Sequence, residues 1–134
     1  MDTDRMDDGD CPFCEPHPDQ VFHEDELVLA LWDRYPVSPG HALLIPRHHV
    51  SGWFEADPVT QLALISALPM AREVIEKKHS PDGFNIGANV GQAAGQTVFH
   101  LHVHLIPRYN GDQEDPRGGV RNVIPGQAKY WERS

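Results

Sequence analysis

Three histidines alternate with apolar residues in the segment QTVFHLHVHLIPRY, which covers positions 96–109. They are His100, His102 and His104. Alternate side chains of an extended strand point to opposite faces, so the three imidazoles are expected on one face, roughly 6.6–6.8 Å apart from one to the next. The apolar residues between them would then point into a core.

Three interpretations of this pattern differ in the chemistry they require. Incidental histidines on a surface strand do not account for the strict alternation. A metal ion held by all three fits poorly, because zinc needs nitrogen atoms about 2.0–2.1 Å away, although one of them could join ligands from elsewhere. Catalysis fits best, since an imidazole that is largely neutral at pH 7 can attack phosphorus while a neighbour holds or supplies a proton.

A loop rich in glycine precedes the histidines. It reads GANVGQAAGQT over positions 87–97, and such loops let backbone N–H groups approach anionic oxygens closely. The loop lacks the G-K-[ST] signature of a P-loop. Gly95, Gln96 and Thr97 lie directly before the histidines, which indicates a phosphate-binding loop.

Two cysteines lie close together in the motif C-P-F-C, at Cys11 and Cys14. Such a pair is either half of a metal site or a redox pair. A redox motif of the thioredoxin type follows a strand and opens a helix, whereas prolines follow here at Pro16 and Pro18. The metal interpretation is therefore favoured.

Composition limits the class of protein. The chain has 134 residues and a net charge of −9, which is enough for one domain and argues against a binder of nucleic acid. Without a long apolar run or a signal peptide, we expect no membrane span and a cytoplasmic location. Positions 1–10 are expected to form an acidic, disordered tail.

The chain is expected to form an α+β fold, with an antiparallel sheet of about five strands and one long helix across it. Strands are predicted over 26–33, 41–47, 83–90 and 97–108. The helix is predicted over 56–80, where Asp57 would cap its start. Its expected apolar stripe consists of Leu62, Ile65, Leu68, Ala71 and Ile75.

The histidine segment resembles the signature of the histidine-triad (HIT) family. The resemblance also includes WDRYPVSPGHALLIPRHHV at 32–50 and DGFNIGANVGQAAGQTV at 82–98, and it covers residues 11–109. Residues 110–134 would be a C-terminal extension of the same domain. The resemblance implies a homodimeric nucleotide hydrolase or transferase that acts at the α-phosphate.

The resemblance also implies roles for individual residues. His102 would be the nucleophile, and His104 would contact the phosphate oxygens or the bridging atom. The remaining site residues implied by the family pattern are His41, which supports the triad, and the nucleotide-binding residues Asp33, Asn89, Gly95, Gln96 and Thr97.

A structural zinc ion is implied as well. Several branches of the family bind zinc through a C-x-x-C pair, a histidine after the I-P-R strand and the first triad histidine. The matching residues here are Cys11, Cys14, His49 and His100, with His48 as the competing choice for the third ligand. Four such protein ligands close the coordination shell, so the zinc would be structural.

The substrate stays open between a dinucleoside polyphosphate and a nucleoside phosphoramidate. A phosphorylase or nucleotidyltransferase, and a nucleotide-binding regulatory module with little turnover, are the alternative functions. In the extension, Arg117 and Arg121 would either reach outer phosphates of a longer substrate or remain solvated. Trp131 is expected to fold over the site of the partner subunit.

Overall fold

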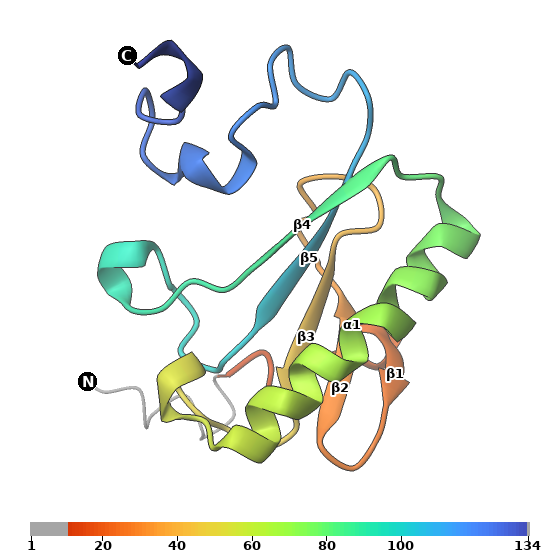
Figure 1. Cartoon of the computed structure of the whole chain (residues 1–134). Coiled ribbons are helices and arrows are strands. Elements are labelled where there is room, and N and C mark those ends of the chain that lie inside the picture. Colours follow the sequence, from red (N-terminus) through yellow and green to blue (C-terminus); the bar gives the residue numbers. More distant parts are fainter. Residues whose placement is uncertain (1–10, 134) are drawn as a thin grey trace.

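The computed structural model describes residues 11–133, so the predicted tail at 1–10 lies outside the described residues. Five strands form one antiparallel sheet in the order β1-β2-β3-β5-β4. One long helix, α1 (Pro58–Lys78), crosses the sheet over β2, β3 and β5 (Figure 1). The predicted α+β architecture is confirmed. The strands are β1 (Val21–Glu24), β2 (Val28–Trp32), β3 (Ala42–Pro46), β4 (Gly83–Gly87) and β5 (Val103–Arg108).

All four predicted strands are shorter in the structure, and a fifth strand was missed. β4 ends at Gly87, which pairs with His104, and β5 begins only at Val103, which pairs with Leu44 of β3. The chain before β5 is held instead by a bond from the Leu101 N–H to the Val50 carbonyl (2.7 Å). β1 was not predicted, although its sequence VFHE pairs with β2.

The start of α1 agrees with the prediction. The Asp57 carboxylate accepts a hydrogen bond from the Thr60 N–H at 2.8 Å, and Pro58 occupies the first helical position, where its missing N–H costs nothing. The same bond holds the pKa of Asp57 below its ordinary value. This cap fixes where the helix begins and hence which face it turns to the sheet.

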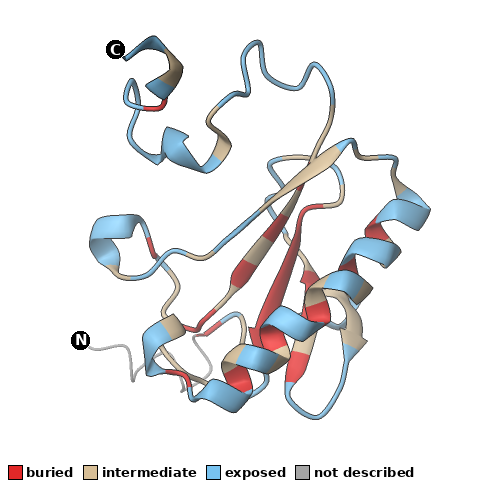
Figure 2. Cartoon of the chain, in the orientation of Figure 1, coloured by how far each residue is buried: buried red, intermediate tan, exposed pale blue. Residues whose placement is uncertain are grey.

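The apolar stripe of α1 was predicted incorrectly in its first half. Leu62 and Ile65 are exposed, at 66% and 47%, and Leu64 is fully buried instead. Three residues rotate around an α-helix by about 300°, which is about 60° less than a full turn. A stripe that repeats every three residues therefore moves around the helix and leaves the buried face. Figure 2 shows the buried side of α1 against the sheet. The buried helix residues are Thr60, Leu64, Ala67, Ala71 and Ile75.

The opposite face of the sheet carries a smaller apolar cluster of Leu31, Leu43 and Ile45. Phe13, from the N-terminal segment, packs against it. Further along this face, the extension from residue 110 contributes two short 3-10 helices, η5 (Gly119–Val123) and η6 (Tyr130–Glu132). No helix within residues 11–133 is both long and apolar enough to cross a membrane.

The position of the helix stripe is tested by a matched pair of leucine variants. Leu64→Ala removes a fully buried side chain and should lower the free energy of unfolding by about 2–5 kcal/mol. Leu62→Ala removes an exposed side chain and should cost less than about 0.5 kcal/mol. Denaturant unfolding measures both, and equal losses in the two variants would contradict the packing described here.

Candidate functional site

Four predicted metal ligands converge near the start of the described chain. Cys11, Cys14, His49 and His100 each offer one ligand atom, and these atoms all lie within 4.8 Å of one another. Cys11 Sγ is 3.4 Å and Cys14 Sγ is 3.6 Å from His100 Nδ1, and Cys14 Sγ is 3.2 Å from His49 Nδ1. A tetrahedral zinc ion spaces neighbouring sulfur and nitrogen ligands roughly 3.3–3.8 Å apart, so these residues could hold it.

His100 is fully buried and has the protonation state that a metal ligand needs. Its Nε2–H donates to the Pro46 carbonyl at 2.9 Å, which leaves Nδ1 without a proton and facing the cysteines. Burial lowers the pKa of His100 to about 4, so the ring is neutral at pH 7. His49, rather than the exposed His48, joins this cluster.

His102 and His104 lie side by side next to this cluster, with ring centroids 5.1 Å apart. The Nδ1–H of His102 donates to the His100 carbonyl at 2.8 Å. In the neutral ring, Nε2 therefore keeps its lone pair. Burial lowers the pKa of His102 below its ordinary value, which favours that neutral form at pH 7.

His41 connects His104 to Asp33. The Val37 N–H donates to His41 Nδ1 at 3.1 Å, so the ring carries its proton on Nε2. This Nε2 lies 3.0 Å from His104 Nδ1 and 3.4 Å from the Asp33 carboxylate. His104 Nδ1 thus accepts from His41, and its own proton sits on Nε2.

The ionisation of these groups follows from burial. Burial, together with the neighbouring His102 and His41, lowers the pKa of His104 to about 4. Burial also lowers the pKa of His41, against the attraction of the Asp33 carboxylate. Although the ligand atoms of Asp33, His41 and His104 also lie within 4.8 Å of one another, the proton on His41 Nε2 makes this a hydrogen-bond chain rather than a metal site.

A pocket of about 430 Å³ opens over the two histidines. Such a volume falls in the range of small-molecule sites. Pro12 and Phe13 form part of its wall, and the Phe13 ring lies 5.0 Å from the His102 ring. Sequence reasoning missed this contribution, although both residues stand between the two cysteines. Of the predicted residues, Asp33, Asn89, Gly95, Thr97, His102 and His104 line the pocket.

Gln96 does not line this pocket. It is buried, and its Nε2 donates to the carbonyls of Ser51 (2.7 Å) and Val98 (3.1 Å) while its Oε1 accepts from the Gly91 N–H (2.9 Å). The side chain therefore ties the glycine-rich loop to the rest of the domain. Gly95 completes the turn with φ = 92°, a left-handed conformation that favours glycine.

The two arginines singled out in the extension, Arg117 and Arg121, are engaged within it. Arg117 makes two bonds of 3.0 Å to the Asp115 carboxylate and lies 4.2 Å over the Trp131 ring. Arg121 donates to the Ala128 carbonyl at 3.1 Å. Neither arginine lines the pocket over the histidines, and Trp131 packs inside its own extension.

Known proteins resemble this chain in sequence. The family model described as the HIT domain matches residues 15–111. Adenylylsulfatase HINT3 of Arabidopsis thaliana is 38% identical over 108 residues, 78% of this chain and 55% of that protein. An uncharacterized HIT-like protein of Methanocaldococcus jannaschii is 41% identical over 84% of this chain and 91% of its own length. The asymmetrical bis(5'-nucleosyl)-tetraphosphatase of Schizosaccharomyces pombe is 39% identical over 72% of this chain and 53% of its own length.

Solved structures of histidine-triad proteins also resemble this chain in fold. A histidine triad nucleotide-binding protein from Sulfolobus tokodaii superposes with a TM-score of 0.71 at 39% identity, covering 76% of this chain and 71% of that one. A zinc-bound histidine triad family protein from Mycobacterium smegmatis gives a TM-score of 0.66 at 36% identity, covering 78% and 79%. The chain spans about half the length of the Arabidopsis and Schizosaccharomyces relatives. With the family model, the fold and the three alternating histidines in agreement, this chain belongs to the HIT family.

Proposed function

We propose that this protein is a nucleotide hydrolase that acts at the α-phosphate through a covalent nucleotidyl-His102 intermediate. Its substrate would be a dinucleoside polyphosphate or a nucleoside phosphoramidate. The observation that carries the proposal is the hydrogen bond from His102 Nδ1–H to the His100 carbonyl. It leaves the Nε2 lone pair for attack on phosphorus, in a ring that lines the pocket.

In the first step, the Nε2 lone pair of His102 forms a bond to the α-phosphorus, and the bond from phosphorus to the leaving group breaks. The leaving group departs with that electron pair and takes up a proton. The imidazole gains positive charge as the new bond forms, and the His100 carbonyl stabilises it by accepting a charge-assisted hydrogen bond from Nδ1–H. In the second step, water attacks the same phosphorus, the bond from phosphorus to Nε2 breaks with its electron pair returning to Nε2, and the proton that the water loses passes to solvent.

His104 is the proposed hydrogen-bond donor to the reacting phosphate. Its Nδ1 accepts from His41, so its Nε2–H is fixed as the donor toward the phosphate oxygens or the bridging atom. Burial keeps this ring neutral, which makes it a donor of a hydrogen bond rather than a fixed cation. His41 orients His104, and Asp33 balances any positive charge that develops along the chain.

The remaining pocket residues would bind the nucleotide. Asp33 offers a carboxylate to the ribose hydroxyls, and Asn89 and Thr97 offer polar groups toward the phosphates. The backbone at Gly95 has no side chain to keep a phosphate away. Gln96, with both ends of its amide engaged inside the loop, would act on the phosphates only by shaping this loop.

The cysteine and histidine cluster is proposed to hold a structural zinc ion. Its four ligands leave no open position for a reacting group, so the ion would supply rigidity rather than chemistry. It would fix Phe13, which stands between the two cysteines, against the ring of His102. The metal would thereby also hold one wall of the pocket.

The nucleophile is tested by His102→Ala, assayed with adenosine phosphoramidate and diadenosine tetraphosphate. Turnover should fall to background, at least about 10³-fold, because no other group in the proposed mechanism forms the bond to phosphorus. His23→Ala, in β1 and outside the pocket, is the matched control and should retain full activity. Substantial turnover by a folded His102→Ala protein would remove His102 from the mechanism.

The metal site is tested by metal analysis of two neighbouring histidine variants. The unaltered protein should copurify with equimolar zinc, and His49→Ala should copurify without it and melt at a lower temperature, because metal binding is coupled to folding. His48→Ala removes an exposed ring outside the cluster and should retain equimolar zinc. Zinc retained in the first variant and lost in the second would reverse the ligand assignment.

A further inference from the structure

Two further pockets continue from the pocket over His102 and His104, here called the catalytic pocket, along the face of the sheet opposite α1. A groove of about 430 Å³ shares Asn89 and His104 with the catalytic pocket. It shares Asn85, Ile106 and Asn122 with an end pocket of about 450 Å³. A single path therefore runs along β4 and β5, from the reacting histidines to the extension. His104 and Arg108 mark its two ends on β5, about 13 Å apart at 3.3 Å per residue.

The middle of this path is apolar and carries no charged residue among those that the structure describes. Ile86 and Ile106 line it from the sheet, and Val120 and Val123 line it from η5. His41 and His104 lie at its inner end, and burial keeps both rings neutral. Additional phosphates of a long leaving group would find no cation here to offset their charge.

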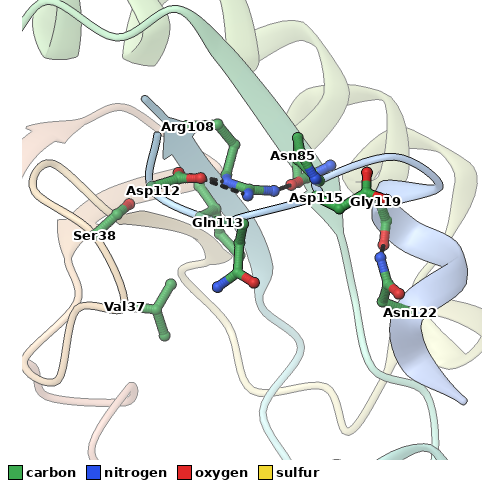
Figure 3. Close-up of a pocket in the computed structure, with 11 residues that line it drawn as sticks. Val37, Ser38, Asn85, Arg108, Asp112, Gln113, Asp115, Gly119 and Asn122 are labelled. Carbon is green, nitrogen blue, oxygen red and sulfur yellow. Dashed lines mark hydrogen bonds and ion pairs between the residues drawn. The ribbon is translucent and has the colours of Figure 1, made fainter. Parts of the chain in front are cut away.

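The end pocket contains a cation, Arg108, but three of its five N–H groups are already used and its charge is matched by a carboxylate. Arg108 donates from Nε and Nη2 to the two oxygens of Asp112, both at 2.8 Å, and from Nη1 to Asn85 Oδ1 at 2.7 Å (Figure 3). This arrangement holds the pKa of Asp112 at about 2, so the pair stays ionised and neutral in sum. Arg117, which pairs with Asp115, does not line the pocket.

The Asp115 carboxylate also lines the end pocket, with both oxygens engaged by Arg117, and amide groups supply the neutral recognition chemistry. Asn85 uses its Oδ1 for Arg108, which leaves its Nδ2 as a donor near Gly119. Asn122 uses its Nδ2 for the Gly119 carbonyl, which leaves its Oδ1 as an acceptor. Figure 3 shows the amide of Gln113 projecting into the space between Val37 and the strands. A donor and an acceptor of this kind match an uncharged amide or a similar neutral group.

We propose that the extension builds a leaving-group subsite that selects uncharged, partly apolar leaving groups ending in an amide-like group. The proposal rests on the proposed function and assigns its substrate class. The α-phosphate would be bonded directly to an organic amine or alcohol, whose apolar body lies along Ile106 and Val123 and whose neutral polar end reaches Asn85, Gln113 and Asn122. A polyphosphate leaving group is disfavoured by the same path.

Four adenosine 5′-monophosphate derivatives, differing only in the leaving group, test this subsite. Three are phosphoramidates that release ammonia, ω-aminooctanamide or ω-aminooctanoate, and they are called the ammonia, octanamide and octanoate compounds. The fourth is diadenosine tetraphosphate, which releases adenosine triphosphate. The octanamide compound should give the highest kcat/KM, about tenfold above the ammonia and octanoate compounds. The amide can exchange hydrogen bonds with the pocket, whereas the carboxylate loses hydration without gaining an unengaged cation.

The variant Gln113→Ala shows whether the gain comes from the end pocket. It should raise KM for the octanamide compound several-fold and leave the ammonia compound unchanged, because ammonia does not extend into the path. Gln127→Ala, in the same extension but outside the pocket, is the matched control and should change neither.

Each contrary result has its own meaning. Turnover of the ammonia compound, with equal kcat/KM for the octanamide and octanoate compounds, would overturn the subsite and leave the proposed function standing. The highest kcat/KM for diadenosine tetraphosphate would overturn the selection against phosphates. Failure to release adenosine 5′-monophosphate from any of the four compounds would overturn the proposed function, and the subsite with it.

Discussion

The buried imidazole of His100 is the constraint on which the rest of the site depends. Its Nε2–H is bonded to the Pro46 carbonyl of β3, its Nδ1 faces the two cysteines, and its carbonyl accepts the Nδ1–H of His102. One residue therefore joins the N-terminal segment to the sheet and fixes the tautomer of the proposed nucleophile. Because His100 is fully buried, each of these polar contacts would be costly to leave unsatisfied.

The same arrangement is compatible with the proposed phosphate chemistry in a chain of net charge −9. Arg34 is the one arginine or lysine among the described residues that line the pocket, and the other proposed donors are neutral, namely the His104 ring and the backbone of the glycine-rich loop. The Val37 N–H sets which nitrogen of His41 carries the proton, and His41 in turn sets the tautomer of His104. In the extension, Arg117 is bonded to a carboxylate and Arg121 to a carbonyl. Recognition of the leaving group is therefore expected to depend on neutral groups there as well.

The sequence predicted many of the residues that the structure brings together, because the C-x-x-C pair and the alternating histidines are short patterns and the family resemblance supplied His49, His41 and Asp33. Sequence reasoning failed where tertiary contacts override local pattern. The segment before Val103 alternates like a strand but lacks a partner strand, and the segment at β1 is too short to stand out. The position of Leu64 depends on the phase of a whole helix, and the wall formed by Phe13 depends on the fold of an irregular segment.

The stereochemical course at phosphorus tests the central claim, a double displacement through His102, most directly. An adenosine phosphoramidate made chiral by one sulfur on the α-phosphorus would be hydrolysed in water enriched in heavy oxygen, and the configuration of the released thiophosphate determined. Each in-line displacement inverts the configuration at phosphorus. Two successive displacements therefore predict net retention of that configuration. Net inversion would show direct attack by water and would contradict a nucleotidyl-histidine intermediate.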